Sequence, residues 1–508
     1  MASEGYPMVA ANATPYSPAE GGGLQADRLV LLLLIGIACL RSLAIIATPL
    51  EIGVDEAQYW LWSQQFDFGY FTKPPLTSWI IGLSHSIFGH HQWAVRIPAP
   101  WLHLATALVL WRAGGWLGGP SAGRLAALLW STLPAVGLGG FLISTDTPLL
   151  LFWSLGLMII IGITGGHLER HRGMVAAGAA FGAALMAKYA AVYGLLGLLI
   201  FVLLHRFWRG HNTVSIKQMV LFCFGCMLLA SPNLVWNISH DFATVRHLGE
   251  NANLTRQSYD IGNSLEFLGA QFLTAGPLAF ALMLGILRLH KQRPETVLLF
   301  GFSVPAMAII TLQAFLSEAN ANWALTAMPA LVLWLSVWGS QMPLSRLSRV
   351  KRNLVRSAIL VNGVICTILV VICWTGQTGP LTPHSDPLRR LRGWQALAAD
   401  TQLVLDAHGA QTVIADRRAS AALLNWHLHG RDVDVLVHDH DGIPSNHFEA
   451  NHPWTPQLGR PVVVLHTDDK PPSIDGISWD DDATLSDVRI SSNRSRSLYL
   501  FTGLETDQ

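Results

Sequence analysis

Two adjacent acids near the start of the chain are the first candidates for chemistry. Asp55 and Glu56 directly follow a long apolar run, and the aromatic residues Tyr59, Trp60 and Trp62 come next. Aromatic side chains at a membrane surface would partly bury the two carboxylates, and a carboxylate in such a place is a candidate general base. Solvated loop charges beside an interfacial aromatic belt would explain the same residues without any chemistry. The residues alone leave both interpretations open.

Lys73 is the candidate cation of the same segment. It precedes Pro74 and Pro75, whose rings stiffen the chain around it. A fixed ammonium at the depth of the lipid headgroups suits a phosphate. A lysine that only extends toward water from apolar surroundings would need no ligand. The segment therefore combines a candidate base with a candidate phosphate-binding cation.

The composition places these residues in a membrane protein. The 508 residues are 51% hydrophobic and 13% charged, whereas soluble domains carry about 25% charged residues. So low a charge excludes a disordered chain, a soluble enzyme and a nucleic-acid binder with a basic face. About eleven apolar runs are candidate membrane spans, of which the two on either side of Lys188 are short. They cover residues 28–50, 98–117, 123–142, 147–165, 173–187, 189–205, 218–236, 264–287, 296–316, 323–341 and 357–375.

The loops between these runs give the expected orientation. With the N-terminus in the cytoplasm, about fifteen basic residues lie inside and about five outside, as the positive-inside rule requires. We expect a disordered cytoplasmic tail over 1–27 and a transmembrane module over 28–375, with a catalytic first outer loop at 51–97. Residues 376–508 are expected to form a periplasmic α/β domain. Its strands are predicted at 412–415, 433–437, 461–465 and 497–501, with a helix over 417–430.

Several strings resemble membrane glycosyltransferases of the GT-C class, in the protein mannosyltransferase-like branch that includes lipid A aminoarabinose transferases and rhizobial galacturonosyltransferases. The main strings are DEAQYW at 55–60 and GYFTKPPL at 69–76. Further matches follow in order: AVRIP at 94–98, STDTPLLLFW at 144–153, AKYAAVY at 187–193, SPNLVWN at 231–237 and NW at 322–323. Together they extend over about 300 residues, at matching positions in the topology.

The resemblance implies a GT-C fold, with the small C-terminal α/β domain outside the membrane. It implies a glycosyltransferase that takes a sugar from a polyprenyl-phosphate donor at the outer face of a bacterial inner membrane. The partners would be that donor, membrane lipids, and a lipid or glycolipid acceptor such as lipid A, less often a protein; nucleic acid is not among them. Neither the sugar nor the acceptor can be identified from the residues.

The site residues follow from the matched strings and from the chemistry of displacement. Asp55 would accept the acceptor's proton, and the departure of the lipid phosphate from the opposite face would invert the anomeric carbon. The expected catalytic acids are Asp55, Glu56 and Asp146. The expected phosphate-binding cations are Lys73, Lys188, Arg246 and Arg256. The residues expected to line the cavity are Tyr59, Tyr70, Arg96, Glu318 and Asn322.

No cofactor is expected to be required. In aminoarabinose transferases an acidic residue that helps to bind a metal would be expected just before the lysine, and Thr72 stands there. The HDHD run at 438–441 matches no standard metal spacing. A divalent metal therefore has no support from the residues.

A polytopic transporter or flippase is the alternative function, because about eleven spans would serve it equally. Transporters place ionisable groups near the midplane of the bilayer. Here the spans hold few charges, Arg41 being an exception, and the acids and lysines gather at one face. A scaffold acting through its exported domain would leave the acids of the first loop without a role. The sequence therefore favours the enzyme.

Overall fold

The computed structural model divides the chain into two compact units. The helical unit contains Met1–Ile46, Lys73–Thr77 and Arg96–Val371, and the α/β unit contains Ala47–Thr72, Ser78–Val95 and Ile372–Gln508. The structure describes residues 21–505 except 210–213, 243, 245–248, 250–258, 288–293, 341–345, 379–385, 440–441, 443, 456–460, 467–469, 471, 475–476 and 492–493. The first outer loop thus belongs largely to the same unit as the C-terminal segment.

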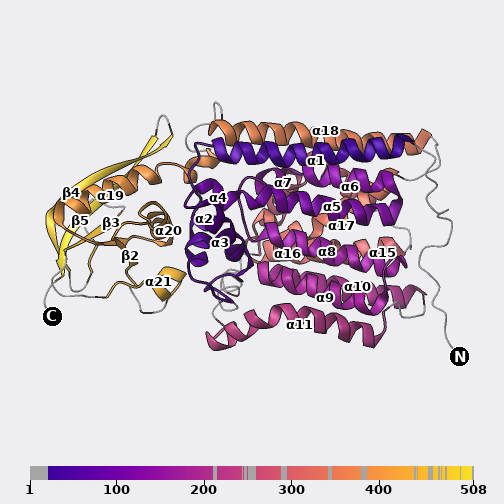
Figure 1. Ribbon diagram of the computed structural model, residues 1–508, viewed down its shortest axis with the longest axis horizontal. Helices are drawn as coiled ribbons and strands as arrows, with labels where there is room; N and C mark the ends of the chain where they lie inside the picture. Colours follow the sequence, from indigo (N-terminus) through magenta and orange to yellow (C-terminus); the bar gives the residue numbers. More distant parts are fainter. Residues whose placement is uncertain are drawn as a thin grey trace. The chain divides into compact units, whose positions relative to one another are not determined.

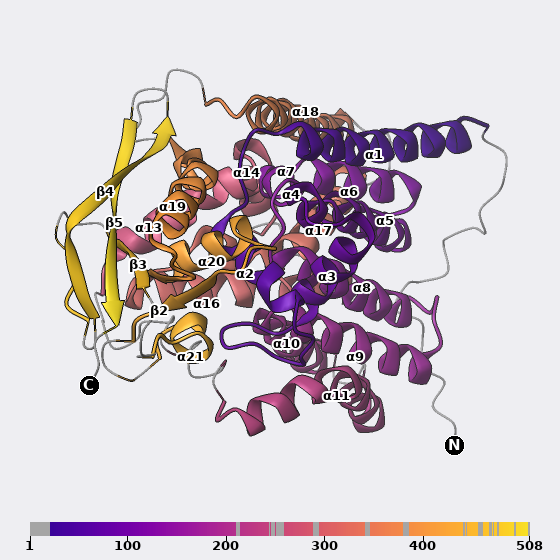
Figure 2. The same ribbon diagram turned by 60° about the vertical axis from the view of Figure 1, so that its left-hand side comes forward.

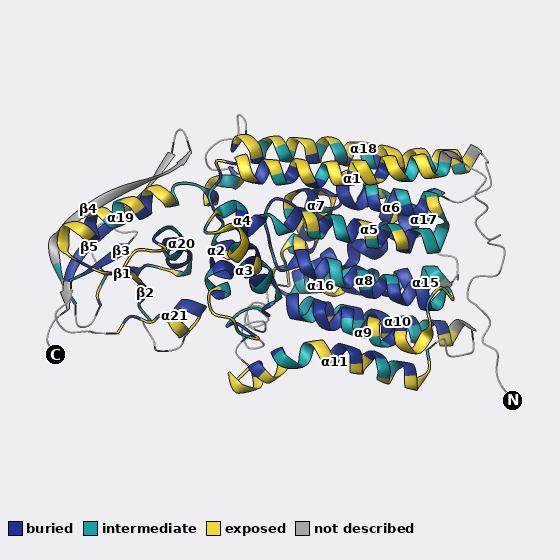
Figure 3. Cartoon of the chain, in the orientation of Figure 1, coloured by how far each residue is buried: buried dark blue, intermediate teal, exposed yellow. Residues whose placement is uncertain are grey.

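The helical unit is built of packed apolar helices (Figure 1). Its elements are α1 (Gly21–Ala47), α5 (Pro98–Gly118), α6 (Pro120–Thr132), α7 (Pro134–Gly139), α8 (Asp146–Thr164), α9 (Arg170–Ala187), η1 (Tyr189–Ala191), α10 (Val192–Arg209), α11 (Ile216–Ser239), α13 (Ile261–Thr274), α14 (Pro277–Leu287), α15 (Pro294–Gly301), α16 (Val304–Leu316), η2 (Ala321–Ala327), α17 (Met328–Ser340) and α18 (Arg346–Thr375). The inner helices are buried, whereas α1, α11 and α18 expose long apolar faces (Figure 3). A bilayer would cover those exposed faces.

Within the described residues, eight helices are long and apolar enough to cross a membrane, or nine if one bent pair counts as a single span. The bent pair is α13 and α14, which meet at an angle of 115° where the sequence predicts one straight span. The break contains Gly276, whose φ of 87° lies in the left-handed region. The predicted span 123–142 is divided between α6 and α7 because Pro134 begins a new helix.

The predicted span 173–187 corresponds to α9, which is rich in alanine and glycine and packs closely against α11. A Cβ atom on Gly178 would lie 1.9 Å from the carbonyl oxygen of Phe222, and one on Gly225 would lie 2.1 Å from that of Val175. Small residues let two helix backbones approach in this way. Helix α9 therefore packs through small residues, which contribute little to the hydrophobicity of its sequence.

Helix α1 begins at Gly21, before the predicted start of the first span at Arg28. The expectation of a disordered tail up to residue 27 is therefore wrong for residues 21–27. The carboxylate of Asp27 lies 2.8 Å from the guanidinium of Arg124 on α6. This ion pair gives the polar first turns of α1 a partner, which the apolar pattern does not reveal.

The α/β unit contains a five-stranded sheet with the order β2-β1-β3-β5-β4. Its strands are β1 (Thr412–Ala415), β2 (Asp434–Val437), β3 (Pro461–His466), β4 (Ile477–Ser491) and β5 (Arg494–Glu505). The first three are parallel, and β5 is antiparallel to β3 and β4. Figure 2 shows the long β4–β5 hairpin. The structure confirms the predicted small α/β domain and adds β4, whose acidic run at 480–482 hides its strand character.

The helices of the α/β unit come from distant parts of the sequence. They are α2 (Val54–Ser63), the greater part of α3 (Leu76–Phe88) and of α4 (Gln92–Arg96), η3 (Pro387–Leu391), α19 (Trp394–His408), α20 (Arg418–His427) and α21 (His447–Asn451). Helix α20 contacts both β1 and β2, and it also contacts α2 from the first outer loop. The first outer loop is therefore packed on the helix that follows β1.

Candidate functional site

Asp55 lies in the first turn of α2 and is accessible. Its side chain is 64% exposed, and its carboxylate pairs with the guanidinium of Arg418 at the start of α20. The Nε atom of the same guanidinium donates to Oε1 of Gln58, at 2.5 Å. The predicted base thus has a cationic neighbour that the sequence does not indicate, because the two residues are separated by 363 positions.

Glu56 has a different environment from that of Asp55. It is buried, and its Oε2 atom accepts the backbone N–H of Gly53 at 2.9 Å. An acidic side chain that reaches back over the first turn stabilises the beginning of a helix. This contact gives Glu56 a structural role at the start of α2, and the catalytic role expected for it stays a prediction.

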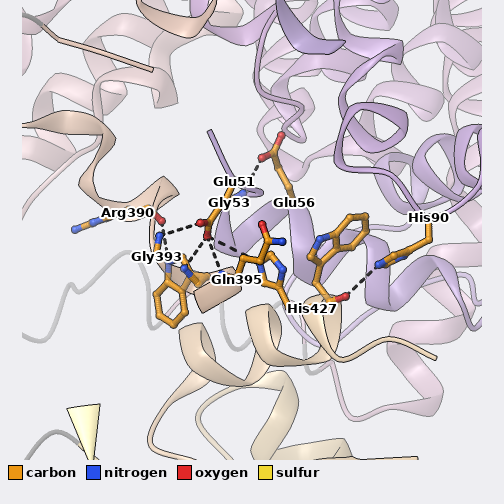
Figure 4. A network of polar contacts seen from close by, with 10 residues as sticks. Glu51, Gly53, Glu56, His90, Arg390, Gly393, Gln395 and His427 are labelled. Carbon is orange, nitrogen blue, oxygen red and sulfur yellow. Dashed lines mark hydrogen bonds and ion pairs between the residues drawn. The ribbon is translucent and has the colours of Figure 1, made fainter. Parts of the chain in front are cut away.

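Glu51 holds the beginning of α19. Its two carboxylate oxygens accept the backbone N–H groups of Gly393, Trp394 and Gln395, at 2.9, 2.7 and 3.2 Å (Figure 4). Burial raises the pKa of Glu51, and the three hydrogen bonds act against that rise. This role of Glu51 is not evident from the sequence, because a capping acid more than 300 positions from its helix leaves no local pattern.

A group of aromatic and histidine side chains surrounds Trp60 of α2. Its ring lies 4.9 Å from that of His90 and 4.8 Å from that of Trp426 on α20. His90 also has its Nε2 atom 3.1 Å from the carbonyl oxygen of Trp426 (Figure 4). Burial lowers the pKa of His90 and that of His427 to about 4. These histidines are therefore neutral near pH 7.

Tyr59 and Tyr70, both expected to line the cavity, are buried within the first loop. The Tyr70 ring stacks on that of Trp62, with 5.0 Å between the centroids. Its hydroxyl donates to the backbone carbonyl oxygens of Trp62 and Gln65. Burial raises the pKa of Tyr70 to about 12. Tyr70 therefore links the end of α2 to the loop segment that leads to Lys73.

The helical unit has its own polar centre, at the start of α8. The Nζ atom of Lys188 lies 2.7 Å from Oδ1 of Asp146, and Nδ2 of Asn322 donates to Oδ2 at 2.8 Å. The backbone of Lys188 is extended, at the break between α9 and η1. The break lies where Lys188 separates two apolar runs of the sequence, and the two contacts of Asp146 bring together three predicted site residues.

Tyr189, the neighbour of Lys188, is tied to α11. Its hydroxyl donates to Oδ1 of Asn233 at 2.7 Å and accepts from Nδ2 of Asn237 at 2.9 Å. Both asparagines belong to the string SPNLVWN. The matched motifs AKYAAVY and SPNLVWN therefore meet in space.

A cavity of about 630 Å³ adjoins this polar centre. Asp146 and Asn322 contribute to its wall, together with Ser144 and Asn320. Most of the remaining wall is apolar and comes from α6, α7, α13 and α18, including Trp130, Leu133, Val136, Leu138, Leu273, Ile365 and Leu369. A cavity that is polar near one acid and otherwise apolar suits an amphiphilic lipid.

The other predicted residues are placed as follows. Lys73 is half-buried in the bend before α3, and Glu318 is exposed in the loop after α16. Arg96 is wholly buried, with its guanidinium 5.2 Å from the centroid of the Phe141 ring. Arg246 and Arg256 lie outside the described residues. Among the residues that the structure describes, no group of three or more histidines, cysteines and acids could hold a metal ion.

Known proteins resemble this chain in sequence and in fold. The family model of the dolichyl-phosphate-mannose-protein mannosyltransferases matches residues 72–236. The lipid A galacturonosyltransferase RgtD of Rhizobium johnstonii is 30% identical over 447 residues, which cover 87% of this chain and 91% of that protein.

Two solved structures have a similar fold. The crystal structure of ArnT from Cupriavidus metallidurans bound to undecaprenyl phosphate has a TM-score of 0.67 at 12% identity, covering 93% of this chain and 97% of that one. The apo oligosaccharyltransferase of Archaeoglobus fulgidus has a TM-score of 0.51 at 12% identity, covering 81% of this chain and 64% of that one.

Proposed function

Because this chain belongs to the GT-C family of membrane glycosyltransferases, we propose that it transfers a sugar from a polyprenyl-phosphate donor to lipid A or a related envelope glycolipid. The name of the relative RgtD indicates lipid A as acceptor and galacturonic acid as sugar. The ArnT structure contains undecaprenyl phosphate, a lipid of the proposed donor class. A hexuronic acid is therefore the proposed sugar.

The protein is a polytopic membrane protein. We propose that its N-terminus lies in the cytoplasm and the α/β unit in the periplasm of a bacterial inner membrane. The excess of lysine and arginine in the loops on one side supports this orientation. The transporter alternative finds no support in the comparisons with known proteins.

The cavity beside Asp146 is the observation that carries the proposal of a lipid-linked donor. Its apolar wall suits a prenyl chain, and the Lys188 ammonium next to Asp146 suits the phosphate at the end of such a chain. Asp146 engages both of its oxygens with Lys188 and Asn322. Its proposed task is to hold Lys188 in place.

Asp55 is the proposed base. Its exposed carboxylate would take the proton of the acceptor hydroxyl as the hydroxyl oxygen forms a bond to the anomeric carbon. The bond from that carbon to the phosphate oxygen breaks, and its electrons leave with the polyprenyl phosphate. Attack from the opposite face inverts the anomeric carbon. Lys73, Lys188, Arg246 and Arg256 are the proposed cations for the charge that grows on the phosphate.

The proposal is tested with the purified protein in lipid nanodiscs. Synthetic polyprenyl-phosphate galacturonic acid and lipid A are added, and the glycolipids are analysed by mass spectrometry. We expect lipid A to gain one hexuronic acid residue with inverted anomeric configuration. Movement of the donor across the bilayer without a covalent product would instead indicate the transporter alternative.

A further inference from the structure

We propose that Arg418 recognises the carboxylate of the acidic sugar, and that it holds Asp55 as a substitute for that carboxylate while no donor is bound. This inference rests on the proposed transfer of a uronic acid and assigns the residue that selects it. The observation behind it is the arrangement of Asp55, Gln58 and Arg418 within the α/β unit.

Arg418 makes two contacts through neighbouring nitrogens of its guanidinium, one with a buried partner and one with an accessible partner. Its Nε atom donates to Gln58, whose side chain is wholly buried. Its Nη2 atom pairs with Asp55, whose side chain is 64% exposed. Asp55 and Gln58 are three positions apart on α2 and therefore lie on one face of the helix. The guanidinium is thus oriented through Nε by a buried contact, and its Nη2 atom lies on an accessible carboxylate.

The contact between Arg418 and Asp55 is suited to exchange. Water screens an ion pair between two exposed side chains, so such a pair contributes little to stability. A second carboxylate can replace Asp55 at small cost, whereas the buried contact with Gln58 keeps the guanidinium in position. The planar guanidinium matches a carboxylate with two parallel hydrogen bonds, which a neutral hydroxymethyl group cannot form. Arg418 also begins the ten-residue helix α20, whose N-terminal end favours an anion.

Two neighbouring basic residues, Arg417 and His447, do not compete with Arg418 for the sugar carboxylate. Arg417 turns to a different partner, since its Nε atom lies 3.5 Å from the carboxylate of Asp416. His447 of α21 has its pKa lowered to about 3 by burial, and the charge of Arg418 contributes to that shift. His447 is therefore neutral near pH 7 and offers no competing positive charge.

The exchange would link sugar recognition to the base. When the sugar carboxylate replaces Asp55 at the guanidinium, Asp55 is released and can accept the proton of the acceptor hydroxyl. The new oxygen–carbon bond then forms as the bond to the donor phosphate breaks, and polyprenyl phosphate leaves with the bonding electrons. Arg418 itself gains and loses no atom. A donor with a neutral sugar would leave Asp55 paired.

The test compares two donors on the same polyprenyl phosphate, one carrying galacturonic acid and the other galactose. Transfer of each is measured as kcat/KM, and binding of each by competition, so that the neutral donor gives a value even where its transfer is slow. In Arg418→Gln we expect kcat/KM for the uronosyl donor to fall about 10- to 100-fold. The neutral donor is expected to bind and react as well as in the unchanged protein, or better, because Asp55 is released.

Two further variants separate recognition from folding. Arg418→Lys keeps the charge but loses the planar fork, so part of the preference for the acidic donor is expected to remain. Arg417→Gln, the matched neighbour, is expected to keep the full preference. An equal loss with both donors in Arg418→Gln would overturn the inference, since it would show only a structural role. Failure of the unchanged protein to transfer either sugar would instead overturn the proposed function, and this inference with it.

Discussion

The Lys188 ammonium lies 2.7 Å from the carboxylate of Asp146, and Asp146 lines a largely apolar cavity. Asn322 holds the second carboxylate oxygen, so the acid is fixed from two sides. The lysine stands where the helix is interrupted between α9 and η1. Non-helical backbone within a membrane protein is tolerated where it is buried in protein or lines a cavity. The interruption and the ion pair are therefore parts of one arrangement.

Replacing Lys188 tests its proposed contact with the donor phosphate. In Lys188→Met we expect kcat/KM for the lipid-linked donor to fall about 100-fold, because one cation that stabilises the departing phosphate is lost. Asp146→Asn should lower kcat/KM by about tenfold, since the lysine loses its ionic partner. The matched control is Arg124→Ala, which removes the ion pair with Asp27. Unchanged donor kinetics in Lys188→Met would exclude the phosphate contact.

Asp55→Asn tests the base. The amide cannot take the acceptor's proton, so kcat is expected to fall about 100- to 10,000-fold. Insertion and folding are checked by size-exclusion chromatography of the detergent-solubilised protein. Asp67→Asn provides the control in the same loop, where the Asp67 carboxylate accepts the backbone N–H of Phe68. Turnover of Asp55→Asn at the rate of the unchanged protein would remove Asp55 from the mechanism.

Glu51→Ala should loosen the start of α19. The substitution leaves three backbone N–H groups without their carboxylate, which we expect to cost about 1–2 kcal/mol in the free energy of unfolding. Hydrogen exchange at Trp394 and Gln395 measures the local effect. Asp432→Ala, which removes an exposed contact with Gln411, serves as the control. Equal protection of α19 in both variants would contradict the capping role.

Acid should destabilise the α/β unit. The lowered pKa values of His90 and His427, about 4 in the folded protein, mean that the unfolded chain binds more protons between pH 6.5 and 4. The free energy of unfolding therefore falls as the pH drops through that window, by about 1.4 kcal/mol per pH unit for each extra proton. Thermal unfolding followed by tryptophan fluorescence measures this slope.

The matched variants for the acid effect are His427→Gln and His408→Gln. The first removes a half-buried titrating group and should reduce the slope between pH 6.5 and 4, whereas the second changes an exposed residue of α19 and should not. An identical slope in His427→Gln and in the unchanged protein would show that this histidine does not carry the effect.

Removal of divalent metals should leave transfer intact. Thr72 stands where an acid could help bind a metal, and the described residues offer no cluster of three ligands. A phosphate monoester held by lysine and arginine has its charge stabilised without a metal. We expect the same kcat/KM before and after treatment with EDTA. Loss of activity that added Mg²⁺ or Mn²⁺ restores would contradict this prediction.

The sequence predicted the elements that leave a local pattern. Apolar runs predicted the long helices, and the β-branched runs predicted β1, β2, β3 and the central part of β5. The charge of Lys188 between two short apolar runs correctly indicated a break in the helix. The bend between α13 and α14 was not predicted because both halves are apolar. The left-handed backbone of Gly276 lies at the turn.

The contacts of the candidate site could be predicted only in part. Motifs in the sequence indicate four of the candidate site residues, namely Asp55, Asp146, Lys188 and Asn322. The motifs do not indicate which residues these four contact. Arg418 and Glu51 make their contacts across more than 300 positions, and no periodicity relates residues so far apart. Glu56 resembles Asp55 in sequence, yet one is buried at the start of α2 and the other is accessible. Such differences depend on the packing of α2 against α20.

The capping of α19 by Glu51 has a consequence for recombination between relatives. The α/β unit is encoded in three separate stretches, 47–72, 78–95 and 372–508. Thr48 also donates to the carbonyl oxygen of Cys373, so a second contact joins the first and last stretches. A chimera that exchanged the C-terminal stretch alone would combine a capping acid from one parent with a helix from the other. Viable breakpoints are those that let all three stretches be inherited together.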